Sequence, residues 1–465
     1  MQAPLDLTAQ LTARMAAALA RLPGTGDTGL VSLVLALPRA PTAVPPLTGP
    51  DTGPQFQLLR VHQGGGHAGF GIAAEWQAQG PRRLHQLAAA AAWLRQHWQR
   101  HDPDETGLDA FALLGFAATG EALPPEADHL PNALLWVPSI GVRQHQDGAA
   151  LVLSARLPAS RATLQAAWGQ ALTELVPRLY QPVRGPLPPA RLVRHRSEPD
   201  RAAWADLVGN ALAQIERGAF AKVVLSRRLE LSSTRQLDLG RLLGALTCLF
   251  PSCQIIHLRR NGASFVAATP ERLLARRGNL LEVDAIAGTA ARASDAEQDQ
   301  ALAAALLGSD KNLREHRFVI DAIRAALTPC CSGIEVPARP EVMQLSNAHH
   351  LWSPIRARTD PRRDCFELAD LLHPTPATNG QPRHAASAWL RQHEPCPRGW
   401  YTGAAGIIEP DRNGELWVLL RCARVCGARA ELYAGAGIVA GSDPDSEWEE
   451  TEAKLGAMLS ALQYA

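Results

Sequence analysis

Lys222 lies where a buried β-strand is predicted to begin. The residues after it, Val223-Val224-Leu225, are apolar and mostly β-branched, as in a strand of the protein interior. One interpretation is that the ammonium group reaches water along its apolar stem, and this segment alone favours it. The other is that the lysine is shielded from water, in which case its neutral amine can act as a base.

Glu271 comes directly after a predicted strand and a proline, in AATPERLLAR. A carboxylate in the first turn of a helix is stabilised by the helix dipole, which is a purely structural interpretation. Burial in an apolar pocket would instead keep the carboxyl group protonated, and such a group can act as a general acid. The sequence leaves both interpretations open.

Three further charged residues lie on predicted helices. Glu450 and Lys454 are four residues apart, a spacing typical of an exposed ion pair of small energetic value. Glu315 alone is an ordinary exposed helix residue. If Glu315 and Glu450 meet in the fold, they form an oxygen site suited to Mg²⁺, which takes one or two carboxylates and completes its shell with water and substrate.

Arg421 lies among apolar residues of a predicted strand, and a buried guanidinium group requires an anionic partner such as a carboxylate. His350 is either a donor to a carbonyl or hydroxyl group or a histidine of the core. Gly435 and Gly437 fall in a predicted hairpin with no βαβ unit around them. This context excludes a dinucleotide-binding fingerprint.

Helices and paired strands are expected to position these residues. We predict helices over residues 1–22, 75–100, 203–217, 300–327 and 446–463. Ser294 and Glu297 are expected to form a capping box at the start of the fourth helix. We predict strands over 222–231, a strand pair within 254–275, and a hairpin of 416–425 with 430–439. Residues 62–71 are expected to be a glycine-rich turn, and residues 181–200 a linker or crossing loop.

The composition is that of a folded, soluble protein. Of 465 residues, 46% are apolar and 20% charged, and 46 basic residues against 45 acidic ones give a net charge of +1. This balance does not favour a nucleic-acid or membrane partner. The eight cysteines include no CxxC pair and predict no disulfide framework, and the first residues lack a signal-like pattern. We therefore expect a cytoplasmic protein of the α+β class with large antiparallel sheets.

Ten segments occur in the order found in chorismate-utilising enzymes, and the chain resembles isochorismate synthases in particular. The segments are AKVVLSR, ATPERL, AIAGTAAR, DKNLREH, HHLWSPI, LLHPTPATNG, RGWYTGAAG, VLLRCA, YAGAGIV and EWEETEAK. The resemblance implies an α/β fold of two interleaved subdomains, with large antiparallel sheets flanked by helices and an active site in the cleft between them. Residues 1–195 would be the variable N-terminal part of this fold, and 196–465 the chorismate-binding catalytic core.

The resemblance also implies a reaction, the Mg²⁺-dependent conversion of chorismate to isochorismate. Lys222 matches the general base that activates water for attack at C2, and Glu271 matches the acid that protonates the departing C4 hydroxyl group. Relatives that add ammonia lack a lysine in this motif. No glutaminase subunit is therefore expected.

The remaining site residues are assigned by the same resemblance. Glu315 and Glu450 match the Mg²⁺ ligands, and Glu447 is assigned a supporting role beside them. The positions that match substrate-binding residues are Gly288, Thr289, His350, Ala377, Thr378, Tyr401, Arg421, Gly435 and Lys454.

One position departs from the family pattern and leaves a second activity open. Ala377 agrees with isochorismate synthases, but the next residue, Thr378, is usually aliphatic in them. A hydroxyl group near the ring could support elimination of pyruvate, so the alternative is a salicylate synthase. A non-catalytic relative should lack at least one catalytic or metal-binding residue, and all of these residues are present here.

We expect a monomer that binds chorismate, and the pathway it serves (menaquinone, siderophore or salicylate) is left open.

Overall fold

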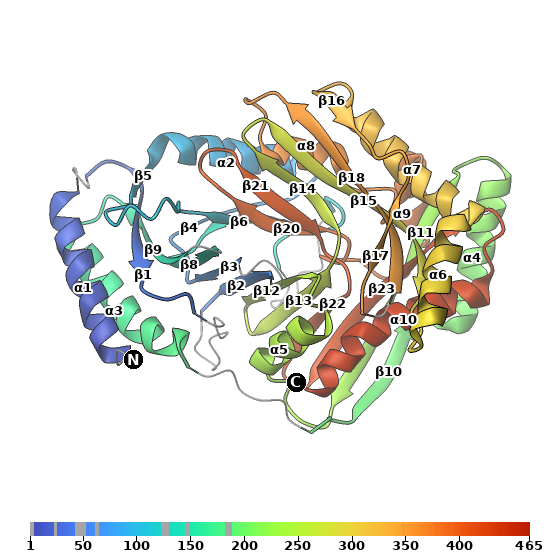
Figure 1. The fold of residues 1–465 in the computed structure, drawn as a ribbon, viewed down its shortest axis with the longest axis horizontal. Coiled ribbons are helices and arrows are strands. Elements are labelled where there is room, and N and C mark those ends of the chain that lie inside the picture. Colours follow the sequence, from blue (N-terminus) through green and yellow to red (C-terminus); the bar gives the residue numbers. More distant parts are fainter. Residues whose placement is uncertain are drawn as a thin grey trace.

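The computed structural model describes residues 4–22, 26–41, 53–60, 65–121, 130–145, 148–181, 188–346 and 348–465. Most strands of this part of the chain belong to two large, predominantly antiparallel sheets that face each other (Figure 1). Among these residues, no helix is long and apolar enough to cross a membrane. The α+β architecture with large antiparallel sheets flanked by helices, as expected from the sequence, is confirmed.

The larger sheet has thirteen described strands and runs through both halves of the chain. Its order is β10 (Leu192–Glu198), β11 (Lys222–Ser233), β23 (Arg429–Val439), β22 (Cys422–Cys426), β13 (Ala263–Thr269), β12 (Gln254–Arg260), β2 (Gln55–Arg60), β3 (Gly65–Phe70), β8 (Ile140–His145), β9 (Gly148–Leu157), β1 (Gly29–Leu37) and β5 (Trp98–His101), with β19 (Gly380–Gln381) beside β11. The β1–β5 pair is parallel.

The second sheet has ten described strands. Its order is β16 (Cys331–Glu335), β18 (Ala348–Thr359), β15 (Leu280–Ala291), β14 (Arg272–Arg277), β21 (Gly414–Val418), β20 (Ala404–Ile408), β6 (Ala112–Phe116), β7 (Ala133–Val137) and β4 (Ala74–Ala78), with β17 (Glu341–Gln344) beside β18. The pairs β12–β2 and β20–β6 join N-terminal to C-terminal strands. Each sheet is therefore shared by the two parts of the chain.

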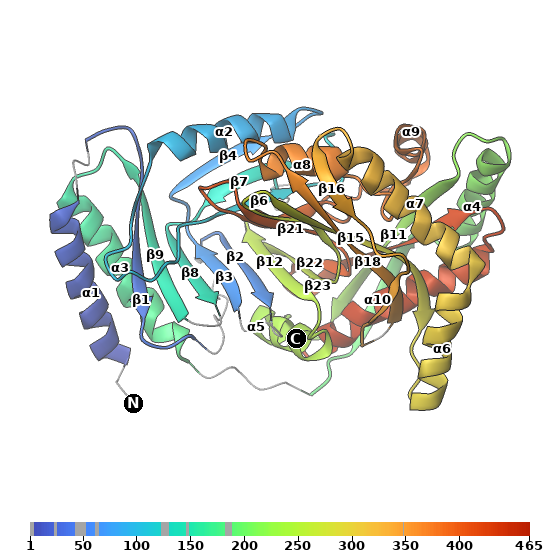
Figure 2. The same ribbon diagram turned by 45° about the horizontal axis from the view of Figure 1, so that its top comes forward.

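Ten helices of the described residues cover the outer faces of the sheets. They are α1 (Pro4–Arg21), α2 (Arg83–His97), α3 (Arg161–Leu179), α4 (Arg201–Glu216), α5 (Leu239–Leu249), α6 (Ala296–Gly308), α7 (Asp310–Leu327), α8 (Cys365–Leu372), α9 (Arg383–His393) and α10 (Pro444–Gln463). Figures 1 and 2 show α1 and α3 at one end of the long axis and α4 and α6 at the other, with α10 running from there toward the middle.

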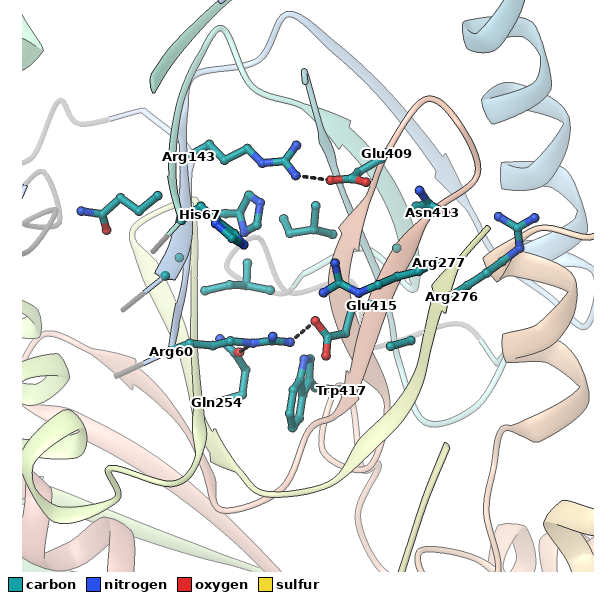
Figure 3. A pocket seen from close by; sticks show the side chains of 18 residues that line it. Arg60, His67, Arg143, Gln254, Arg276, Arg277, Glu409, Asn413, Glu415 and Trp417 are labelled. Atoms are coloured by element: carbon teal, nitrogen blue, oxygen red, sulfur yellow. Dashed lines mark hydrogen bonds and ion pairs between the residues drawn. The ribbon is translucent and has the colours of Figure 1, made fainter. Parts of the chain in front are cut away.

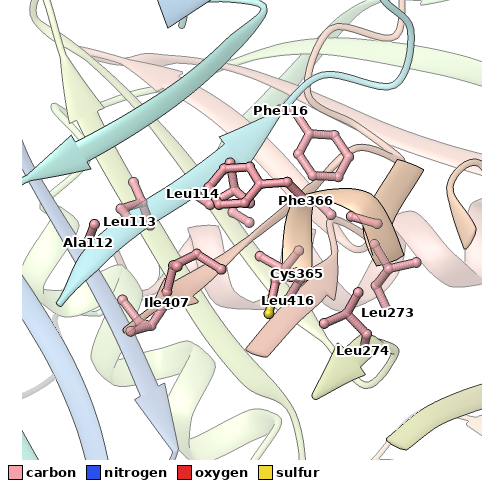
Figure 4. Packing of buried hydrophobic residues seen from close by; sticks show 14 of the residues in the cluster. Ala112, Leu113, Leu114, Phe116, Leu273, Leu274, Cys365, Phe366, Ile407 and Leu416 are labelled. Atoms are coloured by element: carbon pink, nitrogen blue, oxygen red, sulfur yellow. The ribbon is translucent and has the colours of Figure 1, made fainter. Parts of the chain in front are cut away.

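One continuous apolar core takes residues from both sheets and from the helices that cover them. Phe56 and Leu258 come from the larger sheet and Leu114 from the second. Figure 4 shows Phe366 and Cys365 of α8 packed against Leu114 of β6 and Leu416 of β21. Burial on both faces explains why strands such as β1 and β6 are almost wholly apolar instead of alternating.

Several element predictions are wrong in detail. The predicted helix over 300–327 is two helices, separated at Ser309, which caps α7. The N-cap of α6 is Asp295 rather than Ser294, so the predicted capping box does not form. The predicted helix over 75–100 begins only at Arg83, after strand β4.

Two predicted loops contain strands. Within 181–200, residues Leu192–Glu198 form β10, the edge of the larger sheet. Of the predicted turn over 62–71, residues Gly65–Phe70 form β3, while 62–64 lie outside the described residues. Polar composition does not prevent β10 from pairing at the sheet edge, where backbone groups are available for hydrogen bonding. The glycine-rich β3 is paired on both sides, with β2 and β8.

The predicted strand over 416–425 is divided between the two sheets. Its first part belongs to β21 of the ten-stranded sheet and its last part to β22 of the thirteen-stranded sheet. Arg421 lies at the crossing with a φ of 46°, a left-handed backbone that a bulky residue seldom adopts. The predicted hairpin therefore forms only between β22 and β23.

Candidate active site

A cleft of about 110 Å³ lies where the chain passes between the sheets. Glu271 is in the short connection from β13 to β14, and Arg421 is in the connection from β21 to β22. Of the fourteen residues assigned from the sequence, twelve line this one cleft, while Lys222 and Glu447 do not. The twelve are Glu271, Gly288, Thr289, Glu315, His350, Ala377, Thr378, Tyr401, Arg421, Gly435, Glu450 and Lys454.

Lys222 lies directly behind this wall. It is the first residue of β11, and Val224 on the same strand face lines the cleft. The side chain of Lys222 is 1% exposed, and its Nζ donates to Oε1 of Glu315 at 2.8 Å. The amine therefore does not reach bulk water, which makes the snorkelling interpretation wrong.

The opposite face of β11 packs in an apolar cluster, which fixes the position of the strand that carries Lys222. Val223 and Leu225 point away from the cleft into an apolar cluster with Trp204 of α4 and Trp389 of α9. On the cleft side, Gly437 of β23 leaves the space that the lysine occupies. A Cβ atom at Gly437 would stand 3.0 Å from both Lys222 Cε and Glu315 Oε1.

Glu271 is buried among apolar and hydroxyl groups and is not on a helix. It is 3% exposed, its backbone carbonyl accepts from Val418 N at 2.9 Å, and its backbone N–H donates to the Thr269 hydroxyl at 3.3 Å. Burial, with the charge of Asp284 nearby, raises the pKa of Glu271 to about 8. The carboxyl group is therefore mostly protonated at neutral pH and can donate a proton.

Three glutamates lie at one end of the cleft or beside it, and each is paired with a lysine. The pairs are Lys222–Glu315 at 2.8 Å, Lys454–Glu450 at 2.6 Å and Lys311–Glu447 at 3.6 Å. The chain has only these three lysines among 46 basic residues. Lys311 was not identified from the sequence, although the scarcity of lysine in an arginine-rich chain was a usable signal.

The electrostatics of these glutamates are coupled. Burial opposes ionisation of Glu315, but the charges of Lys222 and Lys454 lower its pKa below the usual value. Burial and the charge of Glu450 raise the pKa of Glu447. Glu315 and Glu450 thus line one cleft, and the charge of Lys454 acts on both of them.

These carboxylates fit Mg²⁺ by their chemistry. Among the described residues, no three or more His, Cys, Asp or Glu side chains form a cluster that would hold a metal by protein groups alone. Mg²⁺ does not require one, because it usually keeps several waters and is bound through one or two carboxylates and the substrate. Glu315 and Glu450 supply that number of carboxylates on the wall of the cleft.

Arg421, His350 and Thr289 form a hydrogen-bonded chain along another part of the wall. Arg421 Nη2 lies 2.7 Å from His350 Nε2, and His350 Nδ1 lies 3.1 Å from Thr289 Oγ1. Burial and the charge of Arg421 keep the pKa of His350 well below its usual value. Since a guanidinium group only donates, Nε2 of the neutral imidazole accepts and Nδ1 carries the hydrogen.

Arg421 has one nitrogen to spare. The residue is 9% exposed, and Nη1 is buried with no hydrogen-bond partner among the described residues. A buried, unpaired N–H group of a guanidinium is costly unless an acceptor arrives. This nitrogen therefore fits an anionic group of a ligand.

Two glycines bring backbone close to these side chains. Gly288 has a φ of 82° and marks the irregularity in the pairing of β15 with β18, which places Thr289 opposite His350. Gly435 lies beside Tyr401, whose Oη would be 2.8 Å from an added Cβ atom. The carbonyl oxygen of Gly435 accepts from Lys454 Nζ at 2.8 Å.

A buried ion pair that the sequence did not reveal holds the Ala377–Thr378 loop in place. Glu394 and Arg398 pair at 2.6 Å, and both side chains are less than 10% exposed. Arg398 also donates at 2.6 Å to the carbonyl oxygen of Thr378 and at 2.6 Å to that of Val224. The signal available in the sequence was only the four-residue spacing in EPCPR, which is common on surfaces.

A second cavity, of about 240 Å³, is larger than the cleft but contains none of the assigned residues. It lies between the sheets, where Arg143 faces Glu409 and Arg60 faces Glu415 (Figure 3). Both of its carboxylates are thus engaged by arginines. We take the smaller cleft as the candidate active site because it combines a protonated carboxyl group, a buried lysine and an unpaired guanidinium nitrogen.

Comparison with known proteins places the chain among chorismate-binding proteins. A family model described as chorismate binding enzyme matches residues 18–463. The salicylate biosynthesis isochorismate synthase of Pseudomonas aeruginosa is 38% identical over 289 residues, which are 61% of this chain and 60% of that protein. The isochorismate synthase MenF of Escherichia coli is 30% identical over 394 residues, 82% of this chain and 90% of that protein.

The similarity to solved structures extends along nearly the whole chain. The structure of MenF, the menaquinone-specific isochorismate synthase from Escherichia coli, matches with a TM-score of 0.80 and 28% identity, covering 99% of this chain and 100% of that one. Anthranilate synthase component I from Streptococcus pneumoniae matches with a TM-score of 0.69 at 20% identity, a likeness of fold alone. This chain, by contrast, matches less than two thirds of the length of the Pseudomonas protein.

Proposed function

This chain belongs to the chorismate-binding enzyme family, and from that premise we propose that it is an isochorismate synthase, an isomerase that converts chorismate to isochorismate. The observation that carries the proposal is the pairing of opposite proton-transfer groups at one cleft. Lys222 supplies a buried amine directly behind the cleft wall. Glu271 supplies a protonated carboxyl group that lines the cleft. The names of the relatives support the same activity.

In the proposed reaction, water adds at C2 of chorismate and the C4 hydroxyl group leaves as water. Once its ammonium group has released a proton, Lys222 would accept the proton of the attacking water, and one of its remaining N–H groups could still donate to Glu315. Glu271 gives its proton to the C4 oxygen as the C4–O bond breaks, and the ring double bonds shift. Atoms balance, because one water enters and one leaves.

We assign the binding of the two carboxylates of the substrate to separate cations. The unpaired Nη1 of Arg421, with Tyr401 and the backbone of Gly435 nearby, would hold the enolpyruvyl carboxylate. Lys454 would hold the ring carboxylate. The Gly288–Thr289 segment and His350 would line the ring-carboxylate end and the C4 side of the ring, and Ala377 with Thr378 would line the ring and its side chain.

We propose Mg²⁺ as the cofactor, with Glu315 and Glu450 as its protein ligands and Glu447 in support. When bound there, the ion would offset the repulsion between these glutamates and a dianionic substrate. The fit of the carboxylates to this ion supports the assignment. We also propose that residues 196–465 carry the chemistry, since every residue that lines the cleft lies within them.

The alternative, a salicylate synthase, depended on a hydroxyl group at Thr378 acting near the ring. That hydroxyl group lies 3.3 Å from the carbonyl oxygen of Thr375 and 3.4 Å from its hydroxyl oxygen. It is therefore engaged within its own loop, which favours isochorismate as the product. We further propose a cytoplasmic monomer that needs no glutaminase subunit, the last because Lys222 favours water over ammonia.

The test is product analysis of the purified protein with chorismate and Mg²⁺ by chromatography. The proposal predicts isochorismate alone, and its loss when EDTA removes the metal. Salicylate together with pyruvate would identify the alternative activity. Anthranilate formed from added ammonium would contradict the assignment of Lys222.

A further inference from the structure

The outer edge of strand β11 changes its partner along its length. β19 pairs with this edge at Lys222 and Val223, and β10 pairs with it from Arg228 onward, while β23 lies along the opposite edge. Of the described strands, none pairs with the outer edge between Val223 and Arg228. This gap lies beside the cleft, because Val224 is one of the lining residues.

The side chains of a buried ion pair fill the gap. Arg398 Nη2 donates to the carbonyl oxygen of Val224 at 2.6 Å, and Glu394 Oε1 accepts from the backbone N–H of Ser226 at 3.0 Å. The pair thus supplies a donor and an acceptor to this edge, as a neighbouring strand would. The Ser226 hydroxyl group donates to the same carboxylate oxygen at 2.8 Å.

The same guanidinium group also reaches the loop between α8 and β19. Arg398 Nη1 donates to the carbonyl oxygen of Thr378 at 2.6 Å, and both Thr378 and Val224 line the cleft. Because a guanidinium group is planar and holds its N–H groups in a fixed fork, it sets the distance between the two carbonyl oxygens that it binds. Two bonds to Glu394, of 2.7 Å from Nε and 2.6 Å from Nη2, fix its own orientation.

We propose that the Glu394–Arg398 pair is a positioning unit for the reaction, which holds strand β11 at a fixed distance from the loop that carries Thr378. Lys222 lies on the same strand face as Val224, so a shift of this strand would move the amine relative to the loop. The inference rests on the proposed function for the reaction that is positioned. Neither member of the pair lines the cleft, and neither was assigned from the sequence.

The polar character of the pair is needed for geometry more than for burial. A buried ion pair is often no more stabilising than apolar side chains of the same volume. Apolar side chains, however, supply no donor to the carbonyl oxygens of Val224 and Thr378 and no acceptor for the N–H of Ser226. The relative position of the two cleft walls therefore depends on these hydrogen bonds.

The first test is residue-resolved hydrogen exchange by NMR, which needs no substrate. The N–H of Val224 donates to the carbonyl oxygen of Asn379 in the loop at 2.8 Å. Arg398→Lys keeps the charge but loses the fork, so we expect the N–H groups of Val224 and Ser226 to exchange at least about tenfold faster. The N–H of Leu225 faces β23 and should keep its parental rate. Unchanged exchange at Val224 and Ser226 would overturn the proposal.

Steady-state kinetics test the consequence for catalysis. In Arg398→Lys we expect kcat to fall at least about tenfold with KM little changed, because misplaced reacting groups slow the chemical step more than they weaken binding. Arg83→Lys is the matched control, since Arg83 is also buried and donates to the carbonyl oxygen of Ala117 at 2.7 Å, and neither of these residues lines the cleft. Equal losses of kcat in the two variants would mean a general loss of stability and would contradict the proposal.

Ser226→Ala decides the case in which Arg398→Lys does not fold. This variant removes one of the donors to Glu394 and keeps both members of the ion pair, so kcat should fall by about threefold or more with KM unchanged. A parental kcat in Ser226→Ala would then overturn the proposal. Because hydrogen exchange does not depend on turnover, failure of the protein to form isochorismate would be recognised separately.

Discussion

Nζ of Lys222 lies 2.8 Å from Oε1 of Glu315, and the lysine side chain is 1% exposed while the glutamate side chain is 19% exposed. The base and one of the two proposed metal ligands are thus in direct contact. Lys454 and Glu450 repeat the arrangement at 2.6 Å on α10. The account therefore makes predictions about the base, the acid and the metal that can be tested separately.

Replacing Lys222 should remove the base without removing the substrate site. In Lys222→Met we expect kcat to fall between about a hundredfold and ten-thousandfold, the usual contribution of a general base, with KM changed much less. Lys311→Met is the matched control, because Lys311 is half-exposed and its ion pair is with the supporting Glu447 instead of a proposed metal ligand. Steady-state kinetics with isochorismate detection measure both. Equal losses in the two variants would refute the special role of Lys222.

The pH dependence should report the acid. Glu271 must be protonated to donate, and burial raises its pKa to about 8, so activity should be retained below that pH and lost as the pH rises through it. Glu271→Gln should lose most activity at every pH. The measurement is kcat/KM across pH. An alkaline limb that persists unchanged in Glu271→Asp and Glu271→Gln would show that another group is responsible.

Mg²⁺ should reorganise the three lysine–glutamate pairs. Because the chain has three lysines, reductive methylation with labelled formaldehyde gives few lysine signals in an NMR spectrum. We expect Mg²⁺ to shift the signals of Lys222 and Lys454, whose partners are the proposed ligands, more than that of Lys311. Glu450→Gln should abolish the shifts. Mg²⁺-independent spectra in the unmutated protein would argue against this metal site.

The close approach at Gly437 should not tolerate a side chain. In Gly437→Ala the new Cβ atom would stand 3.0 Å from Lys222 Cε and from Glu315 Oε1, so the pair must shift. We expect at least about a tenfold loss of kcat, since small misplacement of reacting groups is costly. Gly209→Ala is the control, because nothing lies within 4 Å of that position in α4. It should keep full activity and gain roughly 0.5–1 kcal/mol of stability, as in other exposed helices.

The buried Glu394–Arg398 pair should matter for stability. Arg398→Met leaves Glu394 buried without its partner, and we expect a loss of about 3–5 kcal/mol in the free energy of unfolding. Arg362→Met removes an exposed pair with Asp360 and should change it by less than about 0.5 kcal/mol. Denaturant unfolding measures both. A small effect in Arg398→Met would mean that the loop is held by its other contacts.

The sequence predicted the cleft better than it predicted the elements that build it. Lys222, Glu271 and Glu315 were identified from motifs, and the structure brings them to one place. The break of a single apolar run between β21 and β22 was not predictable, because both parts have the same strand-like composition. What divides them is the crossing between sheets, a tertiary constraint that local pattern does not encode.

Supporting contacts were the least predictable part of the site. Glu394 and Arg398 pair with each other, and Arg398 also donates to a partner far along the chain, the carbonyl oxygen of Val224. Their residue types are common in loops, so no local signal separates them from solvent-exposed polar residues. Asp295 replaced Ser294 as the cap of α6 for a simpler reason, since either side chain can cap and the choice is set by one residue of register.

Isotope tracing in heavy-oxygen water is the most direct test of the central claim that Lys222 directs water to C2. The protein, chorismate and Mg²⁺ are incubated in this water, and isochorismate from early times is analysed by mass spectrometry and NMR. The account predicts that the heavy oxygen appears in the C2 hydroxyl group, and that Lys222→Met forms almost none of this product. Isochorismate with an unlabelled C2 hydroxyl group would mean direct transfer from C4, and would contradict the account.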